Sequence, residues 1–112
     1  MSNYIIGNLE TPLAGEELVY SSHKWSFNTP DCFAESLKKA GFNLLTTANN
    51  HCLDRGKIGL LNTLKTLDRY GLEHIGTYAQ KSDKEKIFIK DIGGLRFAFF
   101  IIYLWHQCII KW

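Results

Sequence analysis

The sequence lacks several features that would assign it to a common functional class. Its longest apolar run, from Phe97 to Trp105, is shorter than the roughly 20 residues that a membrane-spanning helix needs. The net charge is only +2 and the basic side chains are scattered, so the basic stripe of a nucleic-acid-binding protein is missing. The three cysteines include no CxxC pair, which excludes a zinc ribbon. The amino end has neither the basic region nor the apolar stretch of a signal peptide. We therefore expect no membrane span in this chain and no nucleic-acid partner.

The residues that are present fit one α/β unit. The chain has 112 residues, of which 46% are hydrophobic and 21% charged, as in an ordinary globular domain or a part of one. Residues 11–26 are rich in Gly, Ser and Glu and are expected to form a loop. Apolar and β-branched runs predict strands near residues 4–6, 43–48, 73–77, 87–89 and 95–102. The last two are expected to form a hairpin through Gly93 and Gly94.

Two helices are expected between the first three strands. The first is expected to begin at Thr29-Pro30-Asp31, with Thr29 as the N-cap and proline at the first helical position, and Gly41 is placed to end it. Its apolar face consists of Phe33, Leu37 and Ala40. The second helix is amphipathic and stops near Gly71. Its apolar residues are Leu60, Leu61, Leu64 and Leu67.

Alternating strands and helices favour an α/β fold with parallel central strands in a mixed sheet and with flanking helices. In such sheets, ligands usually bind outside the carboxyl ends of the strands. Two polar clusters stand at that position here. Gly7-Asn8-Leu9-Glu10 follows the first expected strand, and Asn49-Asn50-His51 follows the second. This coincidence is the main indication of function from the residues alone.

The two clusters carry groups that suit metal-dependent phosphoester chemistry. Glu10 offers carboxylate oxygens, Asn50 an amide oxygen and His51 an imidazole nitrogen. Oxygen ligands suit magnesium or manganese, and an imidazole admits iron or zinc. A carboxylate can bridge two metal ions that clamp the attacking and leaving oxygens. A histidine beside them can protonate a leaving group or hold a developing oxyanion.

Each of these residues, taken singly, also has a purely structural interpretation. Glu10 can be a helix cap or a solvated loop residue, and Asn49-Asn50 can simply be turn residues. His51 alone is more often structural than catalytic. Asp54 can cap the helix that begins near Lys57. Spacing alone therefore leaves a metal site as the minority interpretation.

Several uncommon motifs stand in a fixed order along the chain. Gly7 to Gly15 reads GNLETPLAG, Phe27 to Pro30 reads FNTP, and Ala48 to Gly56 reads ANNHCLDRG. These segments resemble the GNLE-type segment, the FNxP helix entry and the ANNHxxDxG signature of the CapA-type capsule synthesis family (PGA_cap, poly-gamma-glutamate biosynthesis). The match continues through Gly59-Leu60, Thr63-Leu64, Gly71-Leu72 and Gly76-Thr77-Tyr78. It covers about Tyr4 to Phe100, which is nearly the whole chain.

The resemblance implies part of a metallophosphatase-like sandwich, because this family is related to calcineurin-like phosphatases. Asn50 and His51 stand where those enzymes place a GNH motif, and Glu10 stands in the place of a metal-bridging carboxylate. The resemblance thus implies Glu10 and Asn50 as ligands of divalent metal ions (Mn, Mg, Fe or Zn). It implies His51 as catalytic acid or oxyanion stabiliser, with Asp54 supporting that loop.

Two residues of the variable loop add a further expectation. His23 and Trp25 can contact substrate, although a surface role is favoured.

Two departures from the family pattern bear on activity. Family members begin with a strand that ends in Gly-Asp, whose aspartate is a primary metal ligand, and this sequence starts after it. They also carry a later GxHxH-like stretch, and no matching motif surrounds His106. We therefore expect residues 1–112 to be a central fragment of a CapA-type domain, without its first strand and its C-terminal half. Such a fragment is expected to be inactive as it stands.

The end of the sequence also departs from the family. Members commonly continue after Phe99-Phe100 with a stretch like SYTYGTN, whereas residues 101–112 here read IIYLWHQCIIKW. With freely chosen wobble bases, a nucleotide string that encodes these residues reads SYTYGTN when it is displaced by one base. We therefore expect a frameshift near Ile101. The alternative is a genuine, divergent apolar strand.

Three functions stay open at this point. The leading one is a fragment of a capsule or poly-gamma-glutamate synthesis protein with a metallophosphatase-like metal site. The alternatives are a metal-dependent phosphoesterase of another substrate class and a non-catalytic accessory binding module that lost its metals. The expected partner is a polyanionic capsule polymer or a phosphoester substrate. The resemblance places the parent protein at the cell envelope.

Overall fold

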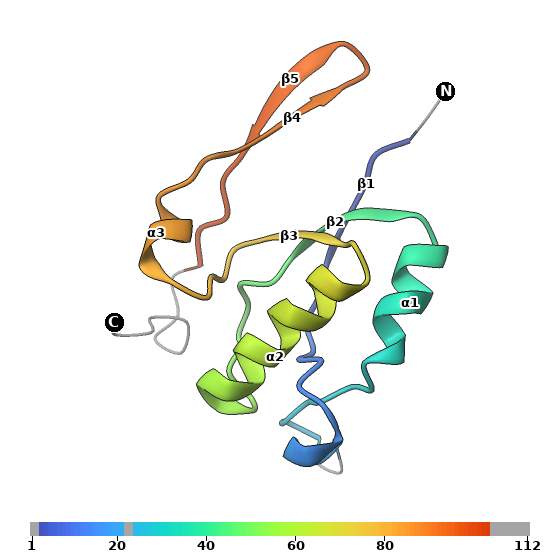
Figure 1. Cartoon of the computed structure of the whole chain (residues 1–112), viewed down its shortest axis with the longest axis vertical. Helices are drawn as coiled ribbons and strands as arrows, with labels where there is room; N and C mark the ends of the chain where they lie inside the picture. The colour runs from blue at the N-terminus through green and yellow to red at the C-terminus, as the bar shows by residue number, and fades with distance from the viewer. Residues whose placement is uncertain (1–2, 22–23, 104–112) are drawn as a thin grey trace.

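The computed structural model of the chain describes residues 3–21 and 24–103. Strands and helices alternate through the first three quarters of the sequence, and a hairpin follows (Figure 1). The elements are β1 (Ile5–Asn8), the 3-10 helix η1 (Glu16–Leu18), α1 (Cys32–Lys39), β2 (Phe42–Thr46), α2 (Gly56–Arg69), β3 (Glu73–Ile75), α3 (Lys81–Lys84), β4 (Phe88–Ile92) and β5 (Leu95–Phe99).

The first three strands form one parallel sheet in the order β1-β2-β3. The pairing of Asn8 with Thr46 and of Thr46 with Ile75 brings the carboxyl ends of all three strands to the same edge. Right-handed crossovers between consecutive parallel strands place both connecting helices on the same face of the sheet. The structure thus confirms the expected α/β fold, with a parallel sheet and flanking helices.

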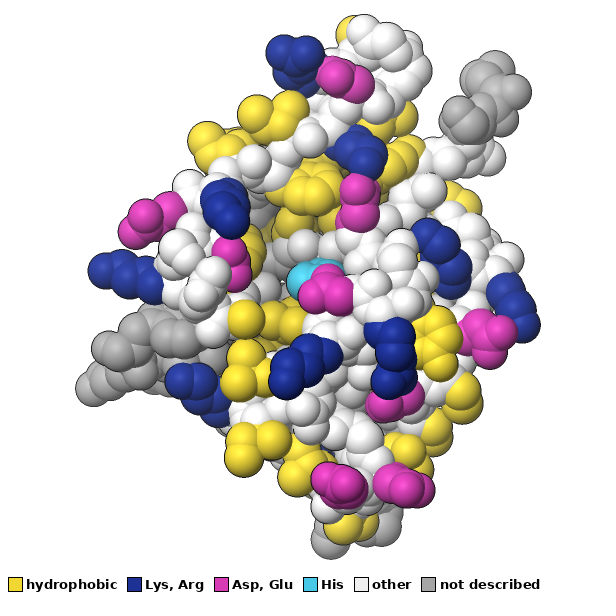
Figure 2. Space-filling model, viewed as in Figure 1, with side chains coloured by type: hydrophobic (Ala, Val, Ile, Leu, Met, Phe, Trp, Pro, Cys, Tyr) yellow, Lys and Arg dark blue, Asp and Glu magenta, His cyan; other side chains and the backbone are white. Residues whose placement is uncertain are grey.

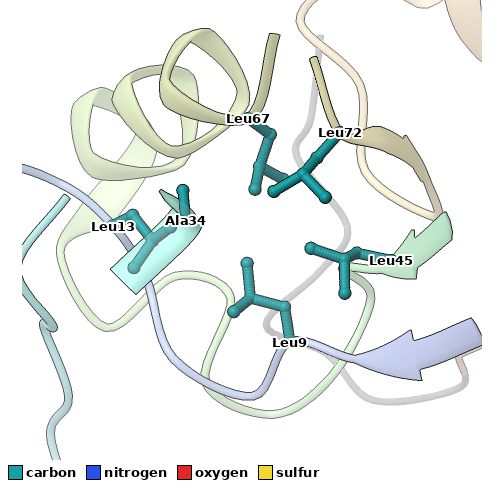
Figure 3. Packing of buried hydrophobic residues seen from close by; sticks show 6 residues of the cluster. All are labelled: Leu9, Leu13, Ala34, Leu45, Leu67 and Leu72. Carbon is teal, nitrogen blue, oxygen red and sulfur yellow. The ribbon is translucent and has the colours of Figure 1, made fainter. Parts of the chain in front are cut away.

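The core lies between this sheet face and the two helices. Six residues form it, from the loop after β1, both helices, β2 and the position just before β3, and their side chains point toward one another (Figure 3). They are Leu9, Leu13, Ala34, Leu45, Leu67 and Leu72. Because successive strand residues face opposite sides, Leu44 points to the other face, where it is also fully buried. The central strand β2 is therefore covered on both faces.

Strands β4 and β5 form a separate two-stranded antiparallel sheet. The hairpin extends away from the parallel sheet and contributes to an elongated shape of 44 × 32 × 22 Å (Figure 1). Near its base, Phe99 packs against Phe88, with ring centroids 5.9 Å apart, and faces Tyr4 at 6.4 Å. The turn glycines Gly93 and Gly94 both have positive φ, as the predicted hairpin requires.

The sequence patterns located most elements but erred at the start of α1. Thr29 is not the N-cap: Asp31 precedes the first helical residue, and no side-chain cap is formed. The Thr29 hydroxyl instead lies 2.8 Å from the Thr11 hydroxyl, so it joins the loop after β1. The short helix α3 was not predicted, and its four residues bury no side chain. Within the described residues, no helix is long and apolar enough to cross a membrane.

Candidate functional site

The loops that follow β1 and β2 are joined at the carboxyl edge of the parallel sheet. Asn49 carries this connection, because its amide nitrogen donates to the Leu9 carbonyl at 2.7 Å and lies 3.2 Å from Asn8 Oδ1. The same side chain accepts the His51 backbone N–H at 3.0 Å, which closes a tight turn. Asn49 is buried, with 5% of its surface exposed. The loop bearing Glu10 and the loop bearing His51 are therefore neighbours, as their positions after parallel strands predicted.

A histidine–carboxylate pair lies in the second of these loops. His51 Nδ1 is 2.7 Å from Asp54 Oδ2, and the two side chains are only 13% and 11% exposed. Since an ionised carboxylate can only accept a hydrogen bond, this contact places a proton on Nδ1. Nε2 is then the ring nitrogen that can contact a substrate. The arrangement can orient an imidazole toward a reacting group.

Phe27 completes this arrangement from a distant part of the chain. Its ring stacks on the His51 ring with centroids 4.0 Å apart and planes 27° from parallel. Its backbone N–H donates to Asp54 Oδ2 at 2.7 Å, so one carboxylate oxygen serves both His51 and Phe27. The sequence contained Phe27 only as part of the FNTP segment, and no local pattern indicates a stack with a histidine 24 positions away.

The structure decides between two interpretations of Asp54. Helix α2 begins at Gly56 after Arg55, and no side chain caps its first turn. Asp54 is therefore not a helix cap, and its carboxylate instead holds His51 and Phe27. The expectation that Asp54 supports the His51 loop fits these contacts.

Arg55, the neighbour of Asp54, ties the loop between β1 and α1 to the loop that carries His51. Its Nε donates to the carbonyls of Leu18 and Val19 at 2.9 and 3.1 Å, and its Nη1 donates to the Ser26 hydroxyl. Trp25, the residue before Ser26, is 76% exposed, and the Lys24 Nζ lies 5.0 Å from the centroid of its ring. The surface role expected for Trp25 agrees with this exposure, while His23 lies outside the described residues.

Glu10 and Asn50, the predicted metal ligands, are both exposed to solvent. Glu10 borders a groove of about 350 Å³ whose walls include the rings of Phe27, Phe33 and Phe42. Asn50 follows Asn49 in the adjoining loop, but it is Asn49 that makes the inter-loop contacts. Within residues 3–21 and 24–103, no group of three or more His, Cys, Asp or Glu side chains is placed to hold a metal ion.

Comparisons with known proteins agree with the motifs. The family model "Bacterial capsule synthesis protein PGA_cap" matches residues 1–104. The chain is 28% identical over 100 residues to the capsule biosynthesis protein CapA of Bacillus anthracis. The aligned region covers 87% of this chain and 24% of that protein. It is 29% identical over 99 residues to the PGA biosynthesis protein CapA of Bacillus subtilis (strain 168), covering 87% of this chain and 26% of that protein.

The chain therefore spans about a quarter of the length of the curated relatives that it matches. The α/β arrangement with its parallel sheet is consistent with a partial metallophosphatase-like fold. Because the family model matches almost all residues of this chain, the chain belongs to the bacterial capsule synthesis protein PGA_cap family.

Proposed function

We propose that this chain contributes one side of a metal-dependent site that acts on a phosphoester or related bond during synthesis of a capsule polymer of the poly-gamma-glutamate type. The observation that carries the proposal is the partly buried His51–Asp54 pair, 2.7 Å apart, at the carboxyl edge of the parallel sheet. The names of the two CapA relatives supply the biological process.

In this proposal His51 is the acid or the oxyanion stabiliser, and Asp54 is the residue that positions it. Asp54 fixes the ring through Nδ1, and the Phe27 ring limits its rotation from one side. Nε2 is then free to donate a proton to a leaving oxygen or to hold a developing negative charge. Because Asp54 also binds the Phe27 backbone, it keeps the imidazole and its stacking partner in register.

Glu10 and Asn50 are proposed as ligands of a divalent metal ion. Their carboxylate and amide oxygens suit Mg²⁺ or Mn²⁺, and an added imidazole admits Fe or Zn²⁺. When bound, such an ion would polarise the phosphoester and supply an activated water. Metal sites in proteins use about four to six donors, so two residues would be an incomplete set. We therefore propose that the chain alone is inactive and that further ligands come from residues beyond those described.

A chimera of the Bacillus subtilis CapA tests this function. The segment of that protein that matches this chain would be replaced by it, and polymer output would be measured in cells that lack their own CapA. We expect output from the unaltered chimera. We expect a loss of about 10²-fold or more with His51→Gln, the range for a general acid, and a smaller loss with Asp54→Asn. Asp91→Asn, an exposed carboxylate on the hairpin, is the matched control.

Undiminished output from the His51→Gln chimera would sink the catalytic assignment. Metal analysis and turnover of a generic phosphodiester by the purified chimera then separate the alternatives. Polymer output without bound metal would indicate an accessory binding module. Bound metal and ester turnover without polymer would indicate a phosphoesterase of another substrate class.

A further inference from the structure

A second hollow lies between the C-terminal half of α2, β3 and the segment that leads into β4. It has a volume of about 440 Å³ and shares no lining residue with the groove beside Glu10. Its apolar lining comes from Leu64 of α2, Ile75 of β3, and Ile87 with Phe88 at the start of β4. We call it the α2–β4 pocket. Its size and mainly apolar lining are those of a site for a small organic molecule.

A second histidine–carboxylate pair stands in this pocket. His74 Nε2 lies 2.7 Å from Asp68 Oδ1, and the His74 side chain is 18% exposed. Because the carboxylate can only accept, Nε2 donates, and this bond fixes Asp68 at the rim. His74 Nδ1 is buried and has no hydrogen-bond partner among the described residues. The face in Figure 2 shows a histidine with an acidic side chain beside it, in a hollow bordered by hydrophobic side chains.

The charges at the rim do not balance. Three charged side chains line the pocket: Asp68, Asp83 and Lys86. Lys86 Nζ lies 3.2 Å from Asp83 Oδ1, so these two charges compensate each other. Asp68 Oδ1 accepts from His74 Nε2, and the second carboxylate oxygen accepts no hydrogen bond from the described residues. Asp68, whose side chain is 70% exposed, therefore stands at the solvent-facing rim of the hollow without a Lys or Arg partner among the described residues.

We propose that the α2–β4 pocket binds a small apolar molecule that carries an ammonium group. The apolar body would cover Leu64, Ile75 and Phe88 and remove their surface from water. The ammonium would pair with the free oxygen of Asp68, which His74 holds in place as a positioning residue. The pocket shares no residue with the His51–Asp54 pair, so this site and the proposed function can fail independently.

Three probes of one shape separate the charge from the apolar contribution. Phenethylamine is a cation at neutral pH, phenethyl alcohol is neutral and phenylacetate is an anion. Binding is followed by the chemical shifts of backbone amides in the intact chain. We expect saturable shifts confined to residues 64–89 and an affinity for phenethylamine about fivefold above that for phenethyl alcohol. That factor corresponds to an ion pair with a partly exposed carboxylate. Phenylacetate is expected to bind most weakly.

Variants of the rim test the assignment to Asp68. Asp68→Asn should lower the affinity for phenethylamine to that for phenethyl alcohol and leave the alcohol unchanged, because only the charge is removed. Its side chain is 70% exposed, so folding should be preserved. His74→Gln should weaken phenethylamine binding by less than Asp68→Asn does. Asp91→Asn, whose exposed carboxylate pairs with Arg96 on the hairpin, is the matched control and should change nothing.

Two results would overturn the proposal. One is the absence of saturable shifts in residues 64–89 with phenethylamine. The other is an Asp68→Asn variant that keeps the full preference of the native chain for the amine over the alcohol.

Discussion

Asn28 is a single polar side chain that organises the loop between β1 and α1. It is 2% exposed, and its amide oxygen accepts the Ala14 N–H at 2.9 Å. Its amide nitrogen donates to the carbonyls of Gly15 and Val19 at 3.0 and 3.1 Å. Val19 has a φ of 61°, a conformation that β-branched residues rarely adopt, so these bonds hold a strained backbone. Because Asn28 follows Phe27, it also helps to fix the ring that stacks on His51.

Replacing Asn28 should therefore cost more than an ordinary surface change. Asn28→Ala removes three hydrogen bonds from a buried loop. The Ala14 N–H loses its partner, and the carbonyls of Gly15 and Val19 keep only their bonds from Leu18 and Arg55. We expect the free energy of unfolding to fall by about 2–3 kcal/mol, the range for breaking a buried hydrogen-bond network. Urea denaturation followed by circular dichroism measures it.

The exposed Asn3 provides the control for Asn28. Asn3→Ala should change the free energy of unfolding by less than about 0.5 kcal/mol. Equal stabilities for the two variants would show that the Asn28 network contributes nothing beyond local solvation.

The candidate site was predictable in its parts and unpredictable in its assembly. Local sequence placed Glu10 and His51 after neighbouring strands, and parallel topology brought their loops together. The link between the loops is Asn49, which the sequence had offered only as a turn residue, because a buried amide that bonds two backbones leaves no periodic signal. The stack of Phe27 on His51 depends on a long-range approach that no local pattern encodes.

Glu73 joins three elements through one carboxylate. Oε1 accepts from Lys90 Nζ of β4 at 2.6 Å, and Oε2 accepts from the Tyr4 hydroxyl, just before β1, at 3.0 Å. Burial acts to raise the pKa of Glu73, but the hydrogen bonds from Lys90 and Tyr4 outweigh it, so the pKa lies below the usual 4.5. Burial, together with the hydrogen bond to the Glu73 carboxylate and its charge, raises the pKa of Tyr4 to about 12.

These pKa shifts predict a fall in stability at both extremes of pH. A carboxyl with a depressed pKa stabilises the fold above its unfolded value, and this contribution is lost as the pH falls below 4.5. A phenol with a raised pKa stabilises the fold below its unfolded value of 10.0, and this contribution is lost as the pH rises toward 12.

Glu73→Gln tests the acid side of this prediction. The variant should be less stable than the native chain at neutral pH, and the difference in urea midpoint should shrink when the pH is lowered well under 4.5. Glu85→Gln, at an exposed position, should show no such pH-dependent difference. If the difference in urea midpoint between Glu73→Gln and the native chain stays constant with pH, ionisation of Glu73 does not contribute to stability as assigned.

Helices and strands with strong periodicity were predictable, while junctions set by distant contacts were not. Helix α2 spans Gly56–Arg69 and ends before Gly71, whose φ is 68°, as its leucine pattern and terminal glycine indicated. The start of α1 was misplaced because Thr29 bonds Thr11, a residue 18 positions earlier, in preference to the helix. Helix α3 could not be predicted from an apolar stripe, because its four residues are all polar and none is buried.

The molecule as a whole consists of a parallel sheet, whose central strand β2 is covered on both faces, and a hairpin with little cover. An isolated two-stranded hairpin is marginally stable, and three or more strands are usually needed. Among the described residues β5 pairs with β4 alone. Its flank is apolar, with Leu95 and Phe100 65% and 69% exposed. An open apolar strand edge is a template for pairing with another chain.

The two edges of the hairpin differ in protection. Strand β4 carries two charged side chains, Lys90 bound to Glu73 and Asp91 bound to Arg96, and charged side chains on an edge strand oppose pairing. Strand β5 carries a single charge, Arg96, which is paired at 3.0 Å with Asp91 of its own hairpin. In an antiparallel pairing of two β5 strands centred on Phe97, Arg96 would lie opposite Ala98 of the second copy, so no like charges would meet. Of the two hairpin edges, β5 is therefore the one through which self-association should proceed.

Sedimentation velocity over a range of protein concentrations tests this expectation. The native chain should associate as its concentration rises, and the double variant Leu95→Lys, Phe100→Lys should shift that onset to higher concentration, since two charges now border the edge. Both side chains are exposed, so the fold should persist. Ile58→Lys, at a residue 67% exposed on α2, removes exposed apolar surface away from any strand edge and should leave association unchanged. If all three proteins sediment alike, the β5 edge does not govern how the chain associates, and an equal delay in both variants would point to exposed apolar area in general.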